Sequence, residues 1–317
     1  MGAYMMPLNG RKKFLITGGA GFIGSHLCRH FLDYKVDEIG LFASGNNTIC
    51  VGNLNRGNGN ISDLVKKPGF YTIPVLNRFR QNAPWENMVD EIGYVLHFAS
   101  YPSPKDHLAM PLETLTADSE GTIEMINLAH AKKAVFMLAS TGHIDQENDP
   151  TQERSVYCEG KRFGEAYTMA AHRKLGLETR IVRMFNSYGP GMRSDDGRVV
   201  PTFIVKALKD ETLSINGGDQ LISLTYIDDM VDGIDRILFS DIVEPVEIGS
   251  PYRISIGDLA RGIIELSGSH SKLNLTPQTV KDERLPDLKR ANELGWFPKV
   301  SIEEGLKRTI NYFREKV

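Results

Sequence analysis

Residues 13–24 read Lys13-Phe14-Leu15-Ile16-Thr17-Gly18-Gly19-Ala20-Gly21-Phe22-Ile23-Gly24. The first five predict a short apolar strand, and the glycines predict a tight loop that opens a helix over residues 23–32. Such a helix start can bind a pyrophosphate: Gly18 permits the turn, Gly21 lets the backbone approach the phosphate, and Gly24 lets the helix pack on the strand. A glycine-rich loop without a ligand is the alternative, but the flanking strand and helix favour a dinucleotide site.

Strands and helices alternate through the first part of the chain. The other predicted strands are at 38–43, 70–73, 94–99, 134–139 and 180–185, with a Gly- and Asn-rich loop at 44–59 and long helices at 112–131 and 155–175. Strands that are apolar throughout and alternate with helices predict an α/β fold, a Rossmann-like doubly wound parallel sheet covered on both faces.

The regular alternation of strands and helices ends after residue 188, which indicates a division into two domains. We expect residues 1–188, with 224–250 returning to them, to form a dinucleotide-binding Rossmann domain. Residues 189–223 and 251–317 would form a smaller C-terminal α/β substrate-binding domain over the carboxyl edge of the sheet, where open α/β sheets bind ligands.

Composition excludes several classes of protein. Hydrophobic residues make up 41%, charged residues 24%, and the net charge is −3, so there is no basic surplus for nucleic acid. No apolar run is long enough to cross a membrane, and three scattered cysteines suit neither a disulfide framework nor a metal site. We therefore expect a cytoplasmic protein with no metal, no membrane partner and no nucleic-acid partner.

The residues expected at the adenosine end of the cofactor leave its identity open. An acidic residue at the end of the second strand usually holds the ribose of NAD, but Ala43 and Ser44 stand there. NADP is possible because no carboxylate would repel its 2′-phosphate, yet the nearest following arginine is Arg56. The sequence thus predicts NAD, with NADP possible and Ser44 as a candidate cofactor contact.

Tyr157 and Lys161 lie four positions apart on the predicted helix 155–175 and therefore share one face. A phenol, with its pKa of about 10, is a poor base at neutral pH, and a nearby ammonium lowers that pKa. Tyr157 could then take the proton of a substrate hydroxyl while hydride leaves for a nicotinamide. Thr141, at a predicted strand end, can hydrogen-bond the same oxygen. Such pairs also occur by chance on ordinary helices, but the glycine loop favours catalysis.

These motifs, together with residues 183–190 (Arg-Met-Phe-Asn-Ser-Tyr-Gly-Pro), resemble the extended short-chain dehydrogenase/reductase superfamily and its NAD-dependent epimerase/dehydratase family over nearly the whole chain. Residues 157–162, 195–201 and 284–298 are similar to the branch that decarboxylates UDP-glucuronate to UDP-xylose. The resemblance implies oxidation of the sugar at C4 by NAD, with Tyr157 as base. The β-keto acid then loses CO₂ and the hydride returns, which gives a UDP-pentose, or a 4-keto-pentose if it does not return.

Motifs and resemblance together give the candidate site. Catalytic candidates are Tyr157, Lys161, Thr141 and His143. Candidate cofactor contacts are Gly18, Gly21, Phe22, Ile23, Gly24, Ser44, Ala99, Ser100, Tyr157 and Lys161. Candidate substrate contacts are Tyr101, Asn186, Arg193, Arg198, Val200 and Arg284. In the family the outer faces of the two long helices form a dimer interface, so the resemblance also implies a homodimer through 112–131 and 155–175.

Several positions depart from the decarboxylase pattern. His143 stands where that branch has a glutamate, and it could be catalytic or structural; Ile222 stands where it has an arginine. A nucleotide-sugar 4-epimerase or 4-keto-reductase, which releases no CO₂, is therefore an alternative. An alternative of another class is a non-catalytic subunit that binds a nucleotide sugar or a dinucleotide.

Overall fold

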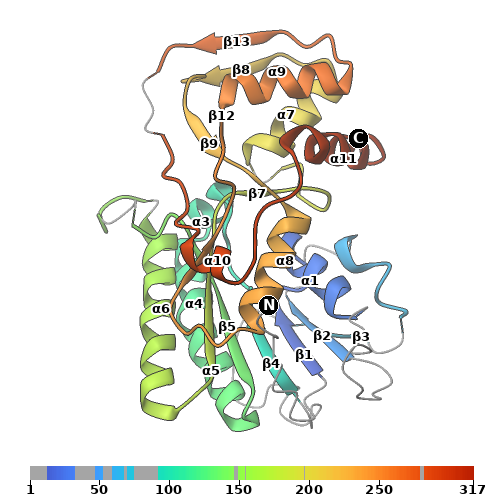
Figure 1. Cartoon of the computed structure of the whole chain (residues 1–317). Coiled ribbons are helices and arrows are strands. Elements are labelled where there is room, and N and C mark those ends of the chain that lie inside the picture. Colours follow the sequence, from blue (N-terminus) through green and yellow to red (C-terminus); the bar gives the residue numbers. More distant parts are fainter. Residues whose placement is uncertain are drawn as a thin grey trace. The chain divides into compact units, whose positions relative to one another are not determined.

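The computed structural model describes residues 13–32, 47–52, 59–67, 70–74, 92–145, 149–153, 155–195, 197–278 and 282–317. Its strands are β1 (Lys13–Thr17), β2 (Asn47–Gly52), β3 (Phe70–Pro74), β4 (Ile92–His97), β5 (Val135–Thr141), β6 (Thr179–Met184), β7 (Ser187–Tyr188), β8 (Leu213–Asn216), β9 (Leu221–Ser223), β10 (Thr225–Tyr226), β11 (Val246–Ile248), β12 (Arg253–Ser255) and β13 (Leu273–Thr276). Its helices are α1 (Phe22–Leu32), the short 3-10 helix η3 (Gly59–Ile61), α3 (Pro104–Ala109), α4 (Pro111–Asp118), α5 (Glu120–Lys132), α6 (Ser155–Leu175), α7 (Val199–Leu208), α8 (Ile227–Leu238), α9 (Ile256–Ser267), α10 (Lys289–Glu293) and α11 (Ile302–Arg314) (Figure 1).

One large sheet carries the fold, with strand order β11-β6-β5-β4-β1-β2-β3. The pairs β1–β2, β2–β3, β1–β4 and β4–β5 are parallel. The chain moves outward from β1 to β3 and then returns to β4 on the other side of β1, so the direction of winding reverses between β1 and β4. Ligands of doubly wound sheets bind outside the carboxyl ends of the strands at this reversal. The Rossmann-like fold predicted from the sequence is confirmed.

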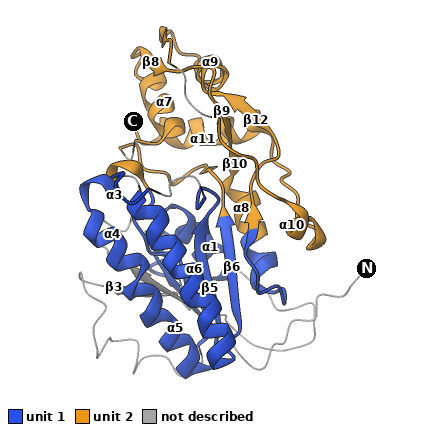
Figure 2. Ribbon diagram, turned by 90° about the vertical axis from the view of Figure 1, so that its left-hand side faces the viewer, with its two compact units in different colours: residues 1–102, 107–183, 234–246 blue, residues 103–106, 184–233, 247–317 orange. Residues whose placement is uncertain are grey.

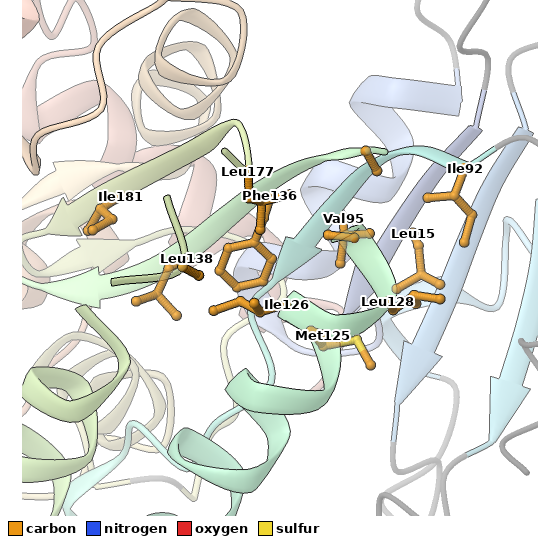
Figure 3. Close-up of a cluster of buried hydrophobic side chains, with 13 residues drawn as sticks. Leu15, Ile92, Val95, Met125, Ile126, Leu128, Phe136, Leu138, Leu177 and Ile181 are labelled. Atoms are coloured by element: carbon orange, nitrogen blue, oxygen red, sulfur yellow. The ribbon is translucent and has the colours of Figure 1, made fainter. Parts of the chain in front are cut away.

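Successive side chains of β1 enter two separate cores because side chains alternate across a strand. Leu15 belongs to a buried cluster with residues of β4, α5, β5 and β6, among them Val95, Ile126 and Phe136 (Figure 3). Phe14 faces the other way and stacks on Phe31 of α1, with ring centroids 4.3 Å apart. Strand β1, at the centre of the sheet, is therefore buried on both faces, as its apolar sequence predicts.

Two of the predicted elements differ from the structure. The loop predicted at 44–59 is wrong for residues 47–52, which form β2; Thr48, Ile49 and Val51 are β-branched and favour a strand, but the Asn and Gly around them hide the signal. The strand predicted at 38–43 lies outside the described residues. The helix predicted at 112–131 is divided at Ser119, whose hydroxyl donates to the carbonyl of Leu115 at 2.6 Å. The backbone at Ser119 has a φ of −103° and a ψ of −77°, which departs from regular helical geometry at the break.

The described chain divides into two compact units (Figure 2). Unit 1 comprises residues 1–102, 107–183 and 234–246, and unit 2 comprises residues 103–106, 184–233 and 247–317. In unit 2, α9 and α11 begin at serine caps: Ser255 accepts from the Asp258 amide at 2.9 Å and Ser301 from the Glu304 amide at 3.2 Å. Within the part of the chain that the structure describes, no helix has both the length and the apolar character needed to cross a bilayer.

Candidate active site

The glycine loop between β1 and α1 is closely packed in unit 1. Gly18 has a φ of +70°, and a Cβ added there would lie 2.6 Å from the carbonyl oxygen of Phe98. A Cβ on Gly24 would collide with the backbone of Gly18, and the Gly21 amide donates to the Gly18 carbonyl at 2.9 Å. Gly21 is exposed, and the first turn of α1 holds no acidic residue. The loop thus offers an anion a helix N-terminus that no nearby carboxylate of that turn opposes.

Thr17 and His97 join the carboxyl ends of β1 and β4 at the reversal point of the sheet. The Thr17 hydroxyl accepts from the amides of Phe98 and Ala99 at 3.2 and 3.1 Å and lies 2.8 Å from Nδ1 of His97. Because the two amides use both lone pairs of the hydroxyl, its single proton goes to Nδ1, and the ring proton must sit on Nε2. Burial, followed by the charge of Lys161, lowers the pKa of His97 to about 3 despite a backbone hydrogen bond to Ala117. This histidine is therefore neutral and structural at physiological pH.

Helix α6 brings Tyr157 and Lys161 together on one face, as their spacing predicts. The Lys161 amine lies 5.6 Å from the centroid of the Tyr157 ring. His107 of α3 stacks on the same phenol ring, with centroids 5.7 Å apart and an angle of 13° between the planes. Tyr157 is half-buried, whereas Lys161 is only 4% exposed. The amine therefore acts on the phenol through a poorly solvated environment, where a charge has a longer reach than in water.

Asp118, the last residue of α4, is the partner of Lys161 that our sequence analysis missed. Its Oδ1 lies 2.9 Å from the Lys161 amine, and the hydroxyl of Ser100 donates to its Oδ2 at 3.1 Å. Burial opposes the charge of Lys161, but the Asp118 carboxylate, together with Tyr157 and Glu165, raises the pKa of the amine above its ordinary value. Burial raises the pKa of Asp118, although the positive charge of Lys161 acts to lower it. The contact favours the ionised pair, since each charge is the main compensation of the other.

A signal for Asp118 is present in the sequence. Thr114, Asp118 and Thr122 recur every fourth residue and are all buried, so they form a polar stripe on a helix face that should otherwise be apolar. Gly160 lies opposite them on α6, and a Cβ there would come within 2.8 Å of the Asp118 Cβ. A polar stripe at helical spacing, matched by a glycine beside the lysine of another helix, could have indicated this contact.

The end of β5 places the remaining catalytic candidates of unit 1. Thr141 is 4% exposed, and its hydroxyl accepts from the His143 amide at 3.1 Å. The thiol of Cys158, next to Tyr157, donates to the His143 carbonyl at 3.6 Å. The backbone of His143 is thus fixed near Tyr157, while its half-buried side chain receives no chemical role from these contacts. Ser140 belongs to a different network, in which its hydroxyl donates to Glu165 at 2.6 Å and Arg183 pairs with the same carboxylate at 2.7 Å.

In unit 2 the two best-placed candidate arginines are paired with carboxylates of the chain itself. Arg284 donates from both terminal nitrogens to Glu247, at 2.8 and 2.7 Å, and lies 4.8 Å from the Phe185 ring. Arg193 donates to Asp106 at 2.9 Å and to both carboxylate oxygens of Asp195, at 2.9 and 3.1 Å. These planar forks have the geometry that also binds a phosphate or a sugar carboxylate.

Asn186, also in unit 2, is paired with a carboxylate as the two arginines are. Its amide nitrogen lies 2.7 and 2.8 Å from the two oxygens of Glu283, which also accepts from the Ser223 amide at 3.2 Å. Ile222 is 4% exposed on β9, opposite Ile254 of β12, so this position adds to the apolar core of unit 2 instead of supplying a cation.

The remaining candidate cofactor and substrate contacts lie at several separate places in the two units. Arg198 is the half-buried residue before α7, Val200 is 2% exposed in its first turn, and Tyr101 is half-buried in unit 1. Phe22, Ile23, Ala99 and Ser100 are half-buried beside the glycine loop or the end of β4, whereas Ser44 lies outside the described residues. In the described ranges, no group of three or more His, Cys, Asp or Glu side chains could hold a metal ion.

Comparison with known proteins shows which family the chain resembles. Residues 14–249 match the model of the family described as "NAD dependent epimerase/dehydratase family". The chain is 35% identical to UDP-glucuronic acid decarboxylase 1 of Xenopus tropicalis, over 97% of this chain and 73% of that protein. It is also 35% identical to UDP-glucuronic acid decarboxylase 4 of Arabidopsis thaliana, over 98% and 71%. A solved structure of UDP-glucuronic acid 4-epimerase from Bacillus cereus, in complex with UDP-glucuronic acid and NAD, superposes with a TM-score of 0.82, at 25% identity and over 96% and 100% of the two chains.

Proposed function

Because the chain belongs to the NAD-dependent epimerase/dehydratase family, we propose that it oxidises the sugar of a UDP-hexuronate at C4 and then removes its carboxylate as CO₂. The family membership, the enzymatic character and the use of NAD predicted from the sequence are confirmed. The observation that carries the proposed reaction is the pairing of Tyr157 with a buried Lys161, in a chain similar to decarboxylases of UDP-glucuronic acid.

The residues of unit 1 fit an NAD molecule. The loop from Gly18 to Gly24 would hold the pyrophosphate at the start of α1, because a side chain at Gly18 or Gly24 has no room. Lys161 would bind the nicotinamide ribose as well as act on Tyr157. When bound, NAD supplies an acceptor for the C4 hydride and later a donor that can return it.

The side chains of unit 1 would move the protons. The phenolate of Tyr157 accepts the proton of the C4 hydroxyl as the hydride leaves, and Thr141 hydrogen-bonds the same oxygen. The new C4 ketone makes the carboxylate at C5 a β-keto acid. The bond between C5 and the carboxyl carbon then breaks, CO₂ leaves, and the electron pair forms an enolate on the C4 oxygen, which the Tyr157 hydroxyl stabilises. A proton then adds at C5.

In unit 2, we propose that Arg193, Arg284 and Asn186 contact the anionic parts of the substrate, together with Arg198 and Val200; in unit 1, we propose Tyr101 as a further substrate contact. Each of the first three is already held by a carboxylate of the chain. A diphosphate or a uronate would therefore exchange with Glu247, Glu283 or Asp195 instead of meeting a free cation, and both states satisfy the donors.

Product analysis tests the proposal. Purified protein is incubated with UDP-glucuronate and NAD⁺, and the nucleotide products are separated and identified by mass spectrometry. The proposal predicts a UDP-pentose or a UDP-4-keto-pentose, formed with release of CO₂ and absent with Tyr157→Phe. Intact UDP-glucuronate in the presence of bound NAD would contradict it.

A 4-epimerase is the second candidate, and two observations favour it. His143 replaces the glutamate of the decarboxylase pattern, and the structure of a UDP-glucuronic acid 4-epimerase superposes over 96% of this chain. The same incubation separates the two, since UDP-galacturonate retains the carboxylate and would establish epimerisation.

We also propose that the protein forms a homodimer through α4–α5 and α6. Leu112 is 74% exposed and Phe163 is 39% exposed, and the Phe163 ring stacks on Tyr167 at 5.7 Å. Sedimentation of Phe163→Glu should show a monomer if this face is buried between subunits; an unchanged sedimentation coefficient argues against it.

The cytoplasmic location predicted from the sequence stays a prediction.

A further inference from the structure

The buried pair of Asp118 and Lys161 adds a positioning residue to the proton-transfer group. Among the anions of unit 1 that act on Lys161, Asp118 lies at 2.9 Å, and Tyr157 adds a second negative charge once it is ionised. Both side chains of the pair are nearly excluded from water, at 5% and 1% exposure. Solvent therefore screens little of the competition between the two anions for a single ammonium.

Asp118 is held in place by more than Lys161. Ser100, after β4, donates to its second oxygen at 3.1 Å, and the absence of a side chain at Gly160 lets α6 approach its Cβ. Asp118 ends α4 just where Ser119 breaks the helix, so its carboxylate is fixed between α4, α6 and the loop after β4. The carboxylate is thus built into the framework and does not depend on substrate for its position.

We propose that Asp118 positions Lys161 beside Tyr157 and withholds part of its positive charge from the phenol, and thereby sets the pH at which Tyr157 ionises. The inference rests on the proposed role of Tyr157 as the base. With Asp118 present, the carboxylate offsets part of the ammonium charge at the phenol. Without the charge of Asp118, more of the Lys161 charge acts on the phenolate, and ionisation of Tyr157 becomes more favourable.

Other charged groups near Lys161 do not replace this effect. Among the described residues, His97 after β4 is neutral, and the Glu165 carboxylate of α6 is bound by Arg183 of β6 at 2.7 Å. From α5, the side chain near this face is the uncharged Thr122, which donates to the Asp118 carbonyl at 2.7 Å. From α3, His107 stacks on Tyr157 and is retained in every variant below.

The test measures the ionisation of Tyr157 without any substrate. The near-ultraviolet absorbance of tyrosinate is titrated in the wild type and in Asp118→Asn, each after subtraction of the same protein carrying Tyr157→Phe. We expect the midpoint of Tyr157 in Asp118→Asn to lie about one pH unit lower, as expected for loss of one buried charge close to the ion pair. Asp118→Glu, which keeps the charge, should restore most of the wild-type midpoint.

A matched control is Asp63→Asn, which removes the same charge from unit 1 at an exposed pair with Arg29. It should leave the Tyr157 midpoint unchanged. A folded Asp118→Asn with the wild-type midpoint, or one shifted upward, overturns the inference. If the enzyme forms no product from UDP-glucuronate while the midpoint falls as expected, the proposed function fails and the pairing stands.

The acid limb of the rate with UDP-glucuronate and NAD⁺ gives a second readout. It should move to lower pH in Asp118→Asn by the same amount as the spectroscopic midpoint. A merely structural role for Asp118 would lower the rate at all pH values and leave the limb in place.

Discussion

Unit 1 and unit 2 both hold cations against carboxylates, but in different surroundings. The pair of Lys161 and Asp118 in unit 1 is buried, with the two side chains 5% and 1% exposed. In unit 2 the Arg284 side chain is 31% exposed and its partner Glu247 is 11% exposed. A buried pair cannot exchange partners without an uncompensated charge, whereas a solvated guanidinium can. Unit 1 thus fixes the charges beside Tyr157, whereas unit 2 leaves its charges open to exchange.

Replacing each cation with an apolar side chain of similar length should give the largest contrast. Lys161→Met leaves Asp118 buried without its partner, and we expect a loss of about 3–5 kcal/mol in the free energy of unfolding. Arg284→Met should change that free energy by no more than about 1 kcal/mol, because water reaches the pair. Urea denaturation measures both values. Equal losses would break the distinction between the units.

The Arg284 variant also sharpens the comparison in catalysis. Arg284→Met should raise KM for UDP-glucuronate while kcat changes less, since the arginine is proposed to bind and not to react. An Arg284 variant that loses kcat at an unchanged KM would place the residue in the chemistry instead.

Gly18 and Gly176 distinguish the cost of a steric clash with a neighbouring backbone from the cost of a strained backbone conformation. Both have positive φ, +70° and +65°, but a Cβ on Gly18 meets the Phe98 backbone, whereas nothing lies within 4 Å at Gly176. Gly18→Ala should therefore cost about 2 kcal/mol more than Gly176→Ala. It should also weaken NAD binding, which calorimetry measures. Similar costs at the two positions would show that the loop relaxes around a side chain.

His97 gives a pH-dependent measure of burial in unit 1. Its pKa falls from 6.5 to about 3 in the folded protein, so the unfolded chain binds more protons between these values. Stability contributed by this difference is present above the unfolded pKa and is lost as the pH falls toward the folded one, at about 1.4 kcal/mol per unit.

Between about pH 7 and about pH 5, the wild type should therefore lose about 2 kcal/mol more than His97→Gln. His130→Gln, at an exposed position on α5, is the control and should follow the wild type. Parallel pH profiles for wild type and His97→Gln would mean that His97 takes up a proton while folded.

How much of the structure the sequence predicts depends on how far apart along the chain the residues of each pattern lie. The strand–glycine–helix at 13–32 and helix α6 were predicted within a residue, because their signals lie within one or two helical turns. The sequence predicts a loop in place of strand β2 because the flanking Asn and Gly residues dominate the local composition. The break at Ser119 was missed because a serine is tolerated inside many helices.

For the candidate site, the sequence indicated side chains but not their partners. Tyr157 and Lys161 were found from their spacing, since a helix makes that geometry local. Asp118 reaches Lys161 only after α4 packs on α6, and Glu247 and Glu283 reach Arg284 and Asn186 only after unit 2 has folded. Contacts between distant segments depend on tertiary packing, so their sequence signal is indirect, as in the polar stripe of Thr114, Asp118 and Thr122.

The most direct test of the central claim is a single-turnover reaction of the wild type and of Tyr157→Phe with UDP-glucuronate and NAD⁺, followed by nicotinamide absorbance and by product mass. We predict that the wild type releases CO₂ and forms a UDP-pentose or its 4-keto form, and that Tyr157→Phe binds NAD normally but is slower by about 1,000-fold. Turnover of UDP-glucuronate by Tyr157→Phe at the wild-type rate would contradict the assignment of this phenol as the base.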